Sequence, residues 1–378
     1  MESILITGGA GFIGSELAAN LLARGKRVRI LDNLSPQIHG ANAAMPAWTR
    51  HPYVEAIHGS ITDRAALETA LQGVVAVAHL AAETGTGQSM YEIARYNEVN
   101  SQGTALLLDI LAQSRDRSVE RIVLTSSRSV YGEGRYHCTH CGADPVYPGS
   151  RSAEAMAAAR WNPVCPQCGS ELTPAPTQES DATQPASIYA ATKLAQEDLI
   201  RVASEALGIG YAILRLQNVY GEGQSLKNPY TGILSIFSTK LRHGSELPLF
   251  EDGEETRDFV HVSDVAEALA RALTAEKAPD SVINVGSGIG ASVREVAGLL
   301  SDALGRPRNL RVTGEYRLGD IRHNAADITR LRAILDFSPQ IDLATGIGRF
   351  ARWAASEELP EDRLDNANAE LRERGLMG

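Results

Sequence analysis

The sequence lacks several features that would place it in other protein classes. Its 378 residues contain no apolar run near the ~20 residues that span a bilayer, and the longest, Val74 to Ala82, includes His79. The formal net charge of −10 argues against a broad basic face for nucleic acid. A strand pattern begins at Ser3, which leaves no room for a signal peptide. We therefore expect a cytoplasmic protein without a nucleic-acid or membrane partner.

Cysteine is also scarce, and all of it lies in two Cys-x-x-Cys-Gly motifs. Four thiolates at this spacing fit a tetrahedral zinc ion, and the glycine after each second cysteine lets the chain turn around the metal. The alternatives are disulfides, which are disfavoured in a cytoplasmic chain, and a redox dithiol, which would not need two matching motifs. The sequence therefore predicts a structural zinc with a closed set of ligands: Cys138, Cys141, Cys165 and Cys168.

The remaining composition, with 43% hydrophobic and 22% charged residues, is typical of a globular protein with a full core, and the length allows two domains. In the first half, short apolar strands alternate with amphipathic helices. The expected strands are Ser3–Thr7, Arg27–Asp32, Val54–His58, Val74–Leu80 and Arg121–Ser126. Such alternation predicts an α/β fold whose parallel sheet is covered by helices on both faces.

A glycine-rich turn joins the first expected strand to a helix at Ser15–Ala23. Its key residues are Gly8, Gly11 and Gly14. Glycine is needed where the chain turns sharply, where the backbone approaches a pyrophosphate and where the helix packs on the strand. The helix N-terminus then offers free N–H groups to negative charge. This arrangement predicts a dinucleotide site of the Rossmann type.

The second expected strand ends at Asp32, where the dinucleotide fingerprint has an acid that binds the ribose hydroxyls. A carboxylate there repels a 2′-phosphate, and no basic residue immediately follows it, so NAD is favoured over NADP. An ordinary aspartate that ends a strand and starts a turn is the alternative interpretation.

Residues 135–180 interrupt the α/β pattern with a stretch rich in proline, glycine, serine and cysteine. We expect residues 1–217 to form a doubly wound NAD-binding Rossmann domain, interrupted by a zinc ribbon at 135–180. Residues 218–378 are expected to form mainly a smaller C-terminal α/β lobe that binds substrate. Within that half, residues 258–280 are expected to return to the first domain.

A helix expected at Ser187–Leu207 carries Tyr189 and Lys193 on one face, one turn apart. Free tyrosine titrates near pH ~10 and is a poor base at neutral pH. A nearby ammonium and the positive nicotinamide of an oxidised cofactor would favour its phenolate. The pair could then take a proton from a substrate hydroxyl while the adjacent carbon gives up hydride.

Taken in order, these motifs resemble the extended short-chain dehydrogenase/reductase superfamily, in its sugar-nucleotide epimerase/dehydratase branch. The segments that carry the resemblance are Thr7–Gly14, His79–Ala82, Asn100–Thr104, Thr125–Gly132, Tyr189–Lys193, Arg215–Gly221, Arg257–Asp264 and Asn284–Gly288. Together they cover nearly the whole chain outside 135–180. The resemblance implies NAD, a nucleotide-diphosphate sugar as substrate, and a homodimer formed through the helix of Tyr189 and the long helix before Leu111.

The resemblance also implies roles for single residues. Ser127 would hydrogen-bond the reacting sugar oxygen beside Tyr189, and Lys193 would also hold the nicotinamide ribose. The implied cofactor contacts are Gly8, Gly11, Phe12, Ile13, Gly14, Asp32, Asn33, Ser60, Ile61, Leu80, Ala81, Ala82, Asn100, Tyr189 and Lys193. The implied substrate contacts are Glu83, Thr84, Ser127, Arg128, Asn218, Arg257 and Arg322. Asn218 and the last two arginines would grip the diphosphate, because a guanidinium can bond two oxygens at once.

One residue departs from the family pattern: Ser60 stands where the family commonly has an aspartate for the adenine amino group. The neighbours of Ser127 separate the family's reactions. Dehydratases need Asp-Glu after the threonine of the catalytic strand, but two serines follow Thr125. Decarboxylases typically have glutamate where Ser129 stands. Reversible oxidation remains, and its commonest use is 4-epimerisation through a transient 4-keto sugar, with Tyr189 as base and resident NAD as hydride carrier.

The segments Ala82–Ser89 and Asn228–Gly232, together with the insertion, resemble the subfamily of epimerases that act on deoxythymidine-diphosphate-L-rhamnose. Two other functions stay open. One is an NAD-dependent sugar-nucleotide dehydrogenase or reductase that works in one direction. The other is a non-catalytic NAD-binding protein that uses its zinc ribbon to recognise RNA or a protein, against which the intact Ser127, Tyr189 and Lys193 and the acidic charge weigh.

Overall fold

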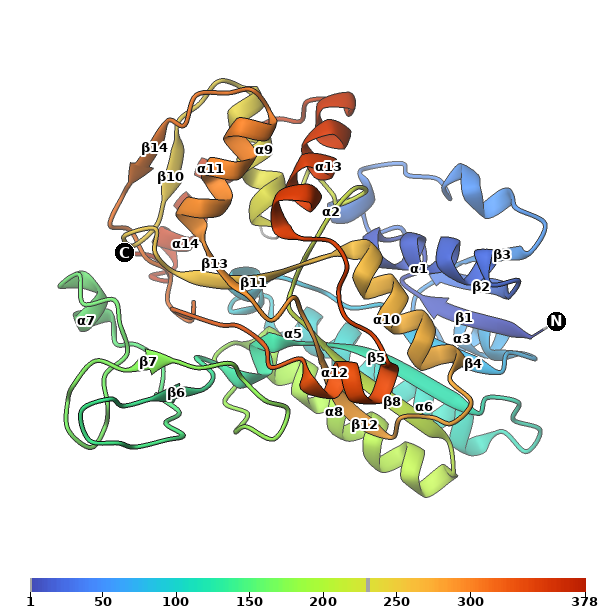
Figure 1. The fold of residues 1–378 in the computed structure, drawn as a ribbon. Helices are drawn as coiled ribbons and strands as arrows, with labels where there is room; N and C mark the ends of the chain where they lie inside the picture. The colour runs from blue at the N-terminus through green and yellow to red at the C-terminus, as the bar shows by residue number, and fades with distance from the viewer. Residues whose placement is uncertain (1, 229–231) are drawn as a thin grey trace.

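The computed structural model describes residues 2–228 and 232–378, and its centre is a parallel sheet of seven strands (Figure 1). The strands lie in the order β12-β8-β5-β4-β1-β2-β3. Their bounds are β1 Ser3–Thr7, β2 Arg27–Asp32, β3 Val54–His58, β4 Ala76–His79, β5 Arg121–Ser127, β8 Gly210–Leu216 and β12 Ser281–Val285. Each neighbouring pair runs parallel. The expected doubly wound sheet is confirmed.

Alternate residues of each strand supply a hydrophobic core on each face of this sheet. The covering helices are α1 Phe12–Ala23, α3 Arg64–Leu71, α6 Gly103–Gln113, α8 Ile188–Leu207 and α10 Val262–Thr274. On one face Ile4 and Ile6 belong to a core with residues of α1 and α10. On the other face Leu5 belongs to a core with residues of α3, α6 and α8. Figure 1 shows α10 crossing in front of the sheet and α8 running beneath it.

The strand order creates a crevice at the carboxyl end of β1, because β1 lies between β2 and β4. In open α/β sheets, ligands bind where the order of the strands reverses in this way. His79, at the end of β4, ties this edge together: its ring nitrogens lie 2.9 Å from the hydroxyls of Thr7 and Thr104. Burial lowers the pKa of His79 to about 3, so the ring is neutral and structural.

The smaller lobe lies beyond the carboxyl ends of the strands and has its own core. One of its sheets has β11 Thr256–His261 at the centre, between β9 Asn218–Tyr220 and β13 Gly290–Ser292. The other pairs β10 Leu247–Leu249 with β14 Leu310–Val312. Its helices are α9 Ile233–Arg242, α11 Val293–Ala303, α13 Leu343–Ser356 and α14 Leu364–Glu373. Figure 1 shows α9, α11 and α13 gathered above the main sheet. The expected α/β substrate lobe therefore has mixed short sheets and a helical layer.

The two parts are interleaved in sequence to a greater extent than expected. Besides the segment 258–280, later residues also return to the first domain. Helix α10 packs along α1 on the main sheet, as expected of that segment. The chain then continues into β12, which pairs with β8 as the edge strand of the main sheet. Helix α12 (Thr329–Leu335) also contributes Leu331 to the core on that face. The first domain thus also contains residues after 280, because the edge of β8 needs a hydrogen-bonding partner.

The remaining short elements are α2 Pro36–His39, α4 Thr86–Ser89, α5 Ile93–Tyr96, β6 Tyr136–His137, α7 Ala153–Ala157 and β7 Thr173–Pro174, with 3-10 turns at Ala47–Arg50 and Arg128–Tyr131. The long helix expected before Leu111 is interrupted, because a π-helical turn at Asn97–Gln102 separates α5 from α6. The insertion containing β6, α7 and β7 forms a projection at the lower left of Figure 1, with a small core of its own. In the described ranges, no helix has the length and apolarity to cross a membrane.

Candidate active site

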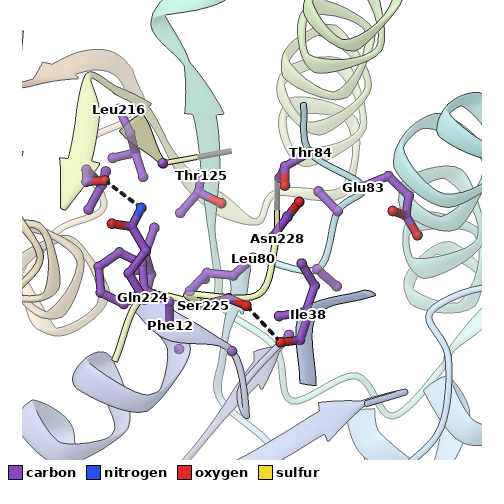
Figure 2. Close-up of a pocket in the computed structure, with 18 of the residues that line it drawn as sticks. Phe12, Ile38, Leu80, Glu83, Thr84, Thr125, Leu216, Gln224, Ser225 and Asn228 are labelled. Atoms are coloured by element: carbon purple, nitrogen blue, oxygen red, sulfur yellow. Dashed lines mark hydrogen bonds between the residues drawn. The ribbon is translucent and has the colours of Figure 1, made fainter. Parts of the chain in front are cut away.

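A cavity of about 810 Å³ opens at the carboxyl ends of the central strands and continues toward the smaller lobe. Figure 2 shows side chains from both parts converging on it, among them Phe12, Leu80, Thr125 and Leu216. Most of the residues predicted from the sequence line this cavity. Those that do are Gly8, Gly11, Phe12, Ile13, Gly14, Asp32, Asn33, Ser60, Ile61, Leu80, Ala81, Ala82, Glu83, Thr84, Ser127, Arg128, Tyr189, Lys193 and Asn218.

The glycine-rich turn has the close contacts that exclude larger residues. Gly8 has a φ of +70°, and a Cβ there would lie 2.9 Å from the nitrogen of Ala81. A Cβ on Gly14 would lie 2.4 Å from the carbonyl oxygen of Gly8. Gly11 is the N-cap residue of α1, and no side chain caps the N-terminus of this helix. The first N–H groups of α1 are thus left for an anion in the cavity, as a dinucleotide phosphate site requires.

Asp32 lies at the cavity edge and shapes the glycine turn. Its two carboxylate oxygens accept the N–H groups of Ala10, at 3.0 Å, and of Leu34, at 2.8 Å. The Nε2 of His39 lies 3.6 Å from the same carboxylate. These bonds hold the Asp32 carboxylate at the edge of the cavity, where it would bind the ribose hydroxyls of a dinucleotide.

Asn100 is the predicted cofactor contact that does not line the cavity. It is fully buried in the π-helical turn, where its amide donates to Thr192 at 3.0 Å. Its Oδ1 accepts the N–H of Glu83 at 2.8 Å. Asn100 thus joins the loop at Glu83 to helix α8. The residue supports the cavity wall rather than forming its surface.

The serine, tyrosine and lysine come together from two elements. Ser127 is the last residue of β5, and Tyr189 and Lys193 lie in the first turns of α8. Ser187 starts that helix by accepting the N–H of Ala190 at 3.1 Å. The Nζ of Lys193 donates to the carbonyl of Thr125 at 2.9 Å, which ties α8 to β5. The three side chains therefore share one wall of the cavity.

Burial controls the protonation of this cluster. It raises the pKa of Tyr189, while a hydrogen bond from Ser127 and the charge of Arg128 act in the opposite direction. Burial also lowers the pKa of Lys193 to about 7, with Glu197 partly opposing the shift. A charge placed in the cavity would therefore shift the pKa of both groups, which is typical of a proton-transfer site.

Arg128 supplies positive charge directly beside Ser127. Its Nε donates to the Oδ1 of Asn218 at 3.1 Å. Burial and repulsion from Arg257 lower the pKa of Arg128 to about 9. Within residues 2–228 and 232–378, no carboxylate lies within 4.0 Å of the Arg128 guanidinium. An anionic ligand would relieve this unbalanced charge.

The other two predicted arginines do not line the cavity. Arg257 lies behind its wall, and its guanidinium donates to the backbone carbonyls of Ile321, at 2.6 Å, and Arg322, at 3.0 Å. Arg322 is paired with Asp252, at 2.7 Å, and with Glu251, at 2.9 Å. Because these carboxylates already satisfy its guanidinium, the geometry gives Arg322 a structural role in place of the phosphate contact expected from the sequence.

Several lining residues were not anticipated. They include Gln37, Ile38 and His39 of α2, and Gln224 and Ser225 after β9. Figure 2 shows the hydroxyl of Ser225 donating to the carbonyl of Ile38, at 3.0 Å, so the two segments close one side of the cavity. No local motif marks these residues, since only the tertiary fold brings them together. Of the segment Asn228–Gly232, residues 229–231 lie outside the described residues.

The four cysteines converge at the tip of the insertion. Their sulfur atoms all lie within 4.8 Å of one another. The Sγ atoms of Cys138 and Cys168 are 3.6 Å apart, and those of Cys141 and Cys165 are 3.7 Å apart. None of the four forms a disulfide. Gly142 and Gly169 have φ values of +77° and +74°, the left-handed turns expected after each second cysteine.

A glycine turn at a helix N-terminus, opposite a serine–tyrosine–lysine cluster, defines a dinucleotide-dependent enzyme site of the short-chain dehydrogenase/reductase type. Residues 4–286 match the NAD dependent epimerase/dehydratase family. The chain is also 42% identical, over 94% of its own length and 96% of the relative's, to the dTDP-L-rhamnose 4-epimerase of Burkholderia thailandensis. The protein therefore belongs to the NAD-dependent epimerase/dehydratase family, and it is an enzyme.

Solved structures agree with this assignment. The UDP-N-acetylglucosamine 4-epimerase of Methanobrevibacter ruminantium, in complex with UDP-N-acetylmuramic acid, matches with a TM-score of 0.76 and 27% identity over 94% of this chain and 99% of that one. The UDP-glucose 4-epimerase of Thermus thermophilus, in complex with NAD, matches with a TM-score of 0.73 and 26% identity over 94% of this chain and 100% of that one.

Proposed function

We propose that this protein is an NAD-dependent 4-epimerase of a nucleotide-diphosphate sugar. The observation that carries the proposal is the convergence of Ser127, Tyr189 and Lys193 on the wall of a cavity whose other end is the glycine turn. One end of the cavity suits a dinucleotide, and the wall beside Arg128 suits an anionic substrate. A single elongated cavity can thus hold both molecules next to the proton-transfer group.

NAD is the proposed resident cofactor. The uncapped N-terminus of α1 would bind its diphosphate, and the Asp32 carboxylate would bind ribose hydroxyls and repel a 2′-phosphate. Ser60, which lines the cavity, would contact the adenine side. Lys193 would hydrogen-bond the nicotinamide ribose. When bound, NAD supplies a reversible hydride acceptor.

The residues of the chain would carry the proton chemistry. The Tyr189 phenolate takes the proton of the sugar C4 hydroxyl, while the Ser127 hydroxyl bonds the same oxygen and holds it in place. Bound NAD would be the acceptor of the C4 hydride, and the transfer would leave a 4-keto sugar. Inversion at C4 requires this sugar to rotate before the hydride is returned to its opposite face, and Tyr189 would then give the proton back.

The proposed substrate is dTDP-L-rhamnose. The 42% identity to a dTDP-L-rhamnose 4-epimerase over nearly the full length of both chains supports this choice. Arg128, which lines the cavity, forms no ion pair within the described parts of the chain, so the substrate side favours an anionic group such as a diphosphate.

Two other reactions of the family are disfavoured by the residues at the catalytic strand. Dehydration would need an acid and a base where Ser126 and Ser127 stand, and the hydroxyl of Ser126 is engaged with Glu197 at 2.5 Å. Decarboxylation is disfavoured by Ser129, whose hydroxyl bonds that of Ser127 at 2.9 Å. A dehydrogenase or reductase that exchanges its cofactor with solvent is the second candidate, since the same residues could serve it.

The cysteine cluster is proposed to hold a structural zinc ion. With Zn–S bonds of about 2.3 Å, a tetrahedral site has sulfur–sulfur distances of about 3.8 Å. The distances of 3.6 Å and 3.7 Å between cysteine pairs fit that geometry. Four thiolates complete the coordination shell, so this metal would stabilise the insertion and take no part in turnover.

A homodimer through α6 and α8 is also proposed. The resemblance to the short-chain dehydrogenase/reductase superfamily, which implies a homodimer through these helices, supports this proposal. Sedimentation of the purified protein would test this state directly.

The deciding experiment incubates the purified protein with dTDP-L-rhamnose and other nucleotide sugars, without added cofactor, and follows C4 stereochemistry by proton NMR. Formation of the C4 epimer without net NADH is the expected result. Consumption of sugar only after NAD is added, with NADH accumulating, would favour the dehydrogenase. A folded, NAD-bound protein that turns over none of the sugars would count against these substrates and point to a different one.

A further inference from the structure

One buried arginine of the cysteine-containing insertion contacts three segments in the rest of the protein. Arg151 lies between the two Cys-x-x-Cys motifs, and its side chain is 4% exposed. Its Nε donates to Glu133 at 3.1 Å, and its Nη1 pairs with Glu251 at 2.8 Å. Its Nη2 donates to the carbonyl of Asp320 at 2.9 Å. One guanidinium therefore joins the insertion to three segments that are far apart in sequence.

Two of these segments lead directly to the substrate side of the cavity. Glu133 follows the 3-10 turn Arg128–Tyr131, so it lies on the chain that leaves the catalytic strand at Ser127. Its other carboxylate oxygen accepts the backbone N–H of Arg322 at 2.8 Å. Glu133 and Arg151 therefore hold the segment 320–322 from both sides.

That segment in turn holds Arg257. The guanidinium of Arg257 donates to the carbonyls of Ile321 and Arg322, at 2.6 Å and 3.0 Å. Arg257 lies on β11, which pairs with β9, and β9 carries Asn218, the hydrogen-bond partner of Arg128. The charge of Arg257 also lowers the pKa of Arg128. A shift of the segment 320–322 would therefore move a charge and a strand that act on Arg128, the arginine that lines the cavity.

A second residue of the insertion contacts the same network. The Oδ1 of Asn162 accepts the Nε of Arg322 at 3.0 Å. The Trp161 ring lies 6.3 Å from that of Tyr316, and the carbonyl of Trp161 accepts a hydrogen bond from Arg151 at 3.2 Å. The insertion is thus fastened to the smaller lobe along one face rather than hanging from a flexible stalk.

We propose that Arg151 is a positioning residue, through which the cysteine-containing insertion holds Arg257, and with it the Arg128–Asn218 pair that lines the cavity, in the geometry that binds the nucleotide sugar. This inference rests on the proposed function, since it concerns the same site. It assigns the insertion a role in substrate affinity, and none in NAD binding, because the contacts of Arg151 lead through the segment 320–322 to Arg257 and not to the glycine turn or Asp32.

The test compares three variants by their affinity for dTDP and UDP, measured by calorimetry on the NAD-containing protein. Arg151→Met removes the charge but keeps most of the volume, and Arg151→Lys keeps the charge but cannot bond all three acceptors. Arg160→Met is the matched control, because Arg160 is an exposed arginine of the same insertion. NAD content, zinc content and circular dichroism are recorded for each protein.

Arg151→Met is expected to weaken nucleoside diphosphate binding by at least about tenfold, and Arg151→Lys by less. Arg160→Met should bind as the wild type does. Zinc and NAD contents should not change, and in turnover assays KM should rise while kcat changes by less than about threefold. This split would not follow from a general loss of structure.

Folded Arg151 variants with wild-type affinity would overturn the inference, as would a parallel loss of NAD and nucleoside diphosphate binding. If Arg151→Met does not fold, Arg151→Lys decides by the same criteria. A wild-type protein that binds neither dTDP nor UDP would refute the proposed function itself. Normal wild-type binding with unaffected Arg151 variants would refute only the positioning role.

Discussion

The guanidinium of Arg128 and the side-chain oxygen of Asn218 are joined by a hydrogen bond of 3.1 Å across the substrate side of the cavity. The bond links the turn after the catalytic strand to β9, the first strand after the main domain. Among the described residues the bond uses only the Nε of Arg128, which leaves the outer nitrogens of the guanidinium for a ligand. The pair defines where an anionic part of the substrate would lie relative to Tyr189.

Replacing Arg128 by glutamine should therefore raise KM by about tenfold to a hundredfold, the usual loss for a hydrogen bond to a charged group. Because the charge of Arg128 lowers the pKa of Tyr189, the same change should also move the rise of kcat to higher pH. Both effects are read from KM and kcat measured across pH. Arg128→Lys is the control, and it should restore the pH dependence of kcat more fully than it restores KM. If Arg128→Gln and the wild type had the same pH dependence of kcat, the electrostatic role of Arg128 would be contradicted.

Tyr189→Phe removes the proposed base with little change in packing. Turnover should fall by about 10²- to 10⁴-fold, the range for loss of general acid–base catalysis. Resident NAD should remain, since the contacts at the glycine turn and Asp32 are untouched. NMR turnover rates and cofactor absorbance after denaturation measure the two quantities. Turnover at the wild-type rate would assign proton transfer to another group.

The buried lysine of the cluster makes a prediction about stability and pH. The pKa of Lys193 falls from 10.5 to about 7 in the folded protein, so the unfolded chain binds the proton more readily between these values. The contribution of Lys193 to the free energy of unfolding should therefore rise with pH in this window, by at most about 1.4 kcal/mol per pH unit.

The measurement is urea unfolding of the wild type and Lys193→Met at about pH 7 and about pH 9. The difference between the two proteins cancels the titration of the other groups. The wild type should gain stability relative to Lys193→Met at the higher pH. A difference that stays constant with pH would mean that Lys193 keeps a normal pKa when folded.

The cysteine cluster predicts one zinc ion per chain, measurable by mass spectrometry of the metal after purification. Cys138→Ser should lose this zinc and lower the melting temperature by at least about 5 °C, because Cys138 is both a ligand and part of the small core of the insertion. Arg160→Met, at an exposed position of the insertion outside the ligand set, is the control and should keep the metal. Purified wild-type protein free of zinc, and unaffected by adding it, would falsify the assignment.

The strands of the main sheet could be predicted almost residue by residue, since β1, β2 and β3 begin and end where their apolar runs do. The long helix before Leu111 could not, because the π-helical turn at Asn97–Gln102 depends on the contacts of Asn100 with Glu83 and Thr192. In the site, the glycine turn and the Tyr189–Lys193 pair were accessible from spacing alone. The lining by α2 and by Ser225 was not, since it is made by segments distant in sequence.

By itself the sequence determined the parallel sheet, the glycine turn, the proton-transfer pair and the four-cysteine cluster. These depend on short-range periodicity and spacing, which the local geometry of helices, strands and turns translates directly into position. The tertiary structure alone decided which arginines line the cavity, because a long charged side chain pairs with carboxylates that come from segments distant in sequence. Arg322 pairs with Glu251 and Asp252, whereas Arg128 lines the cavity and forms no ion pair with the residues that the structure describes.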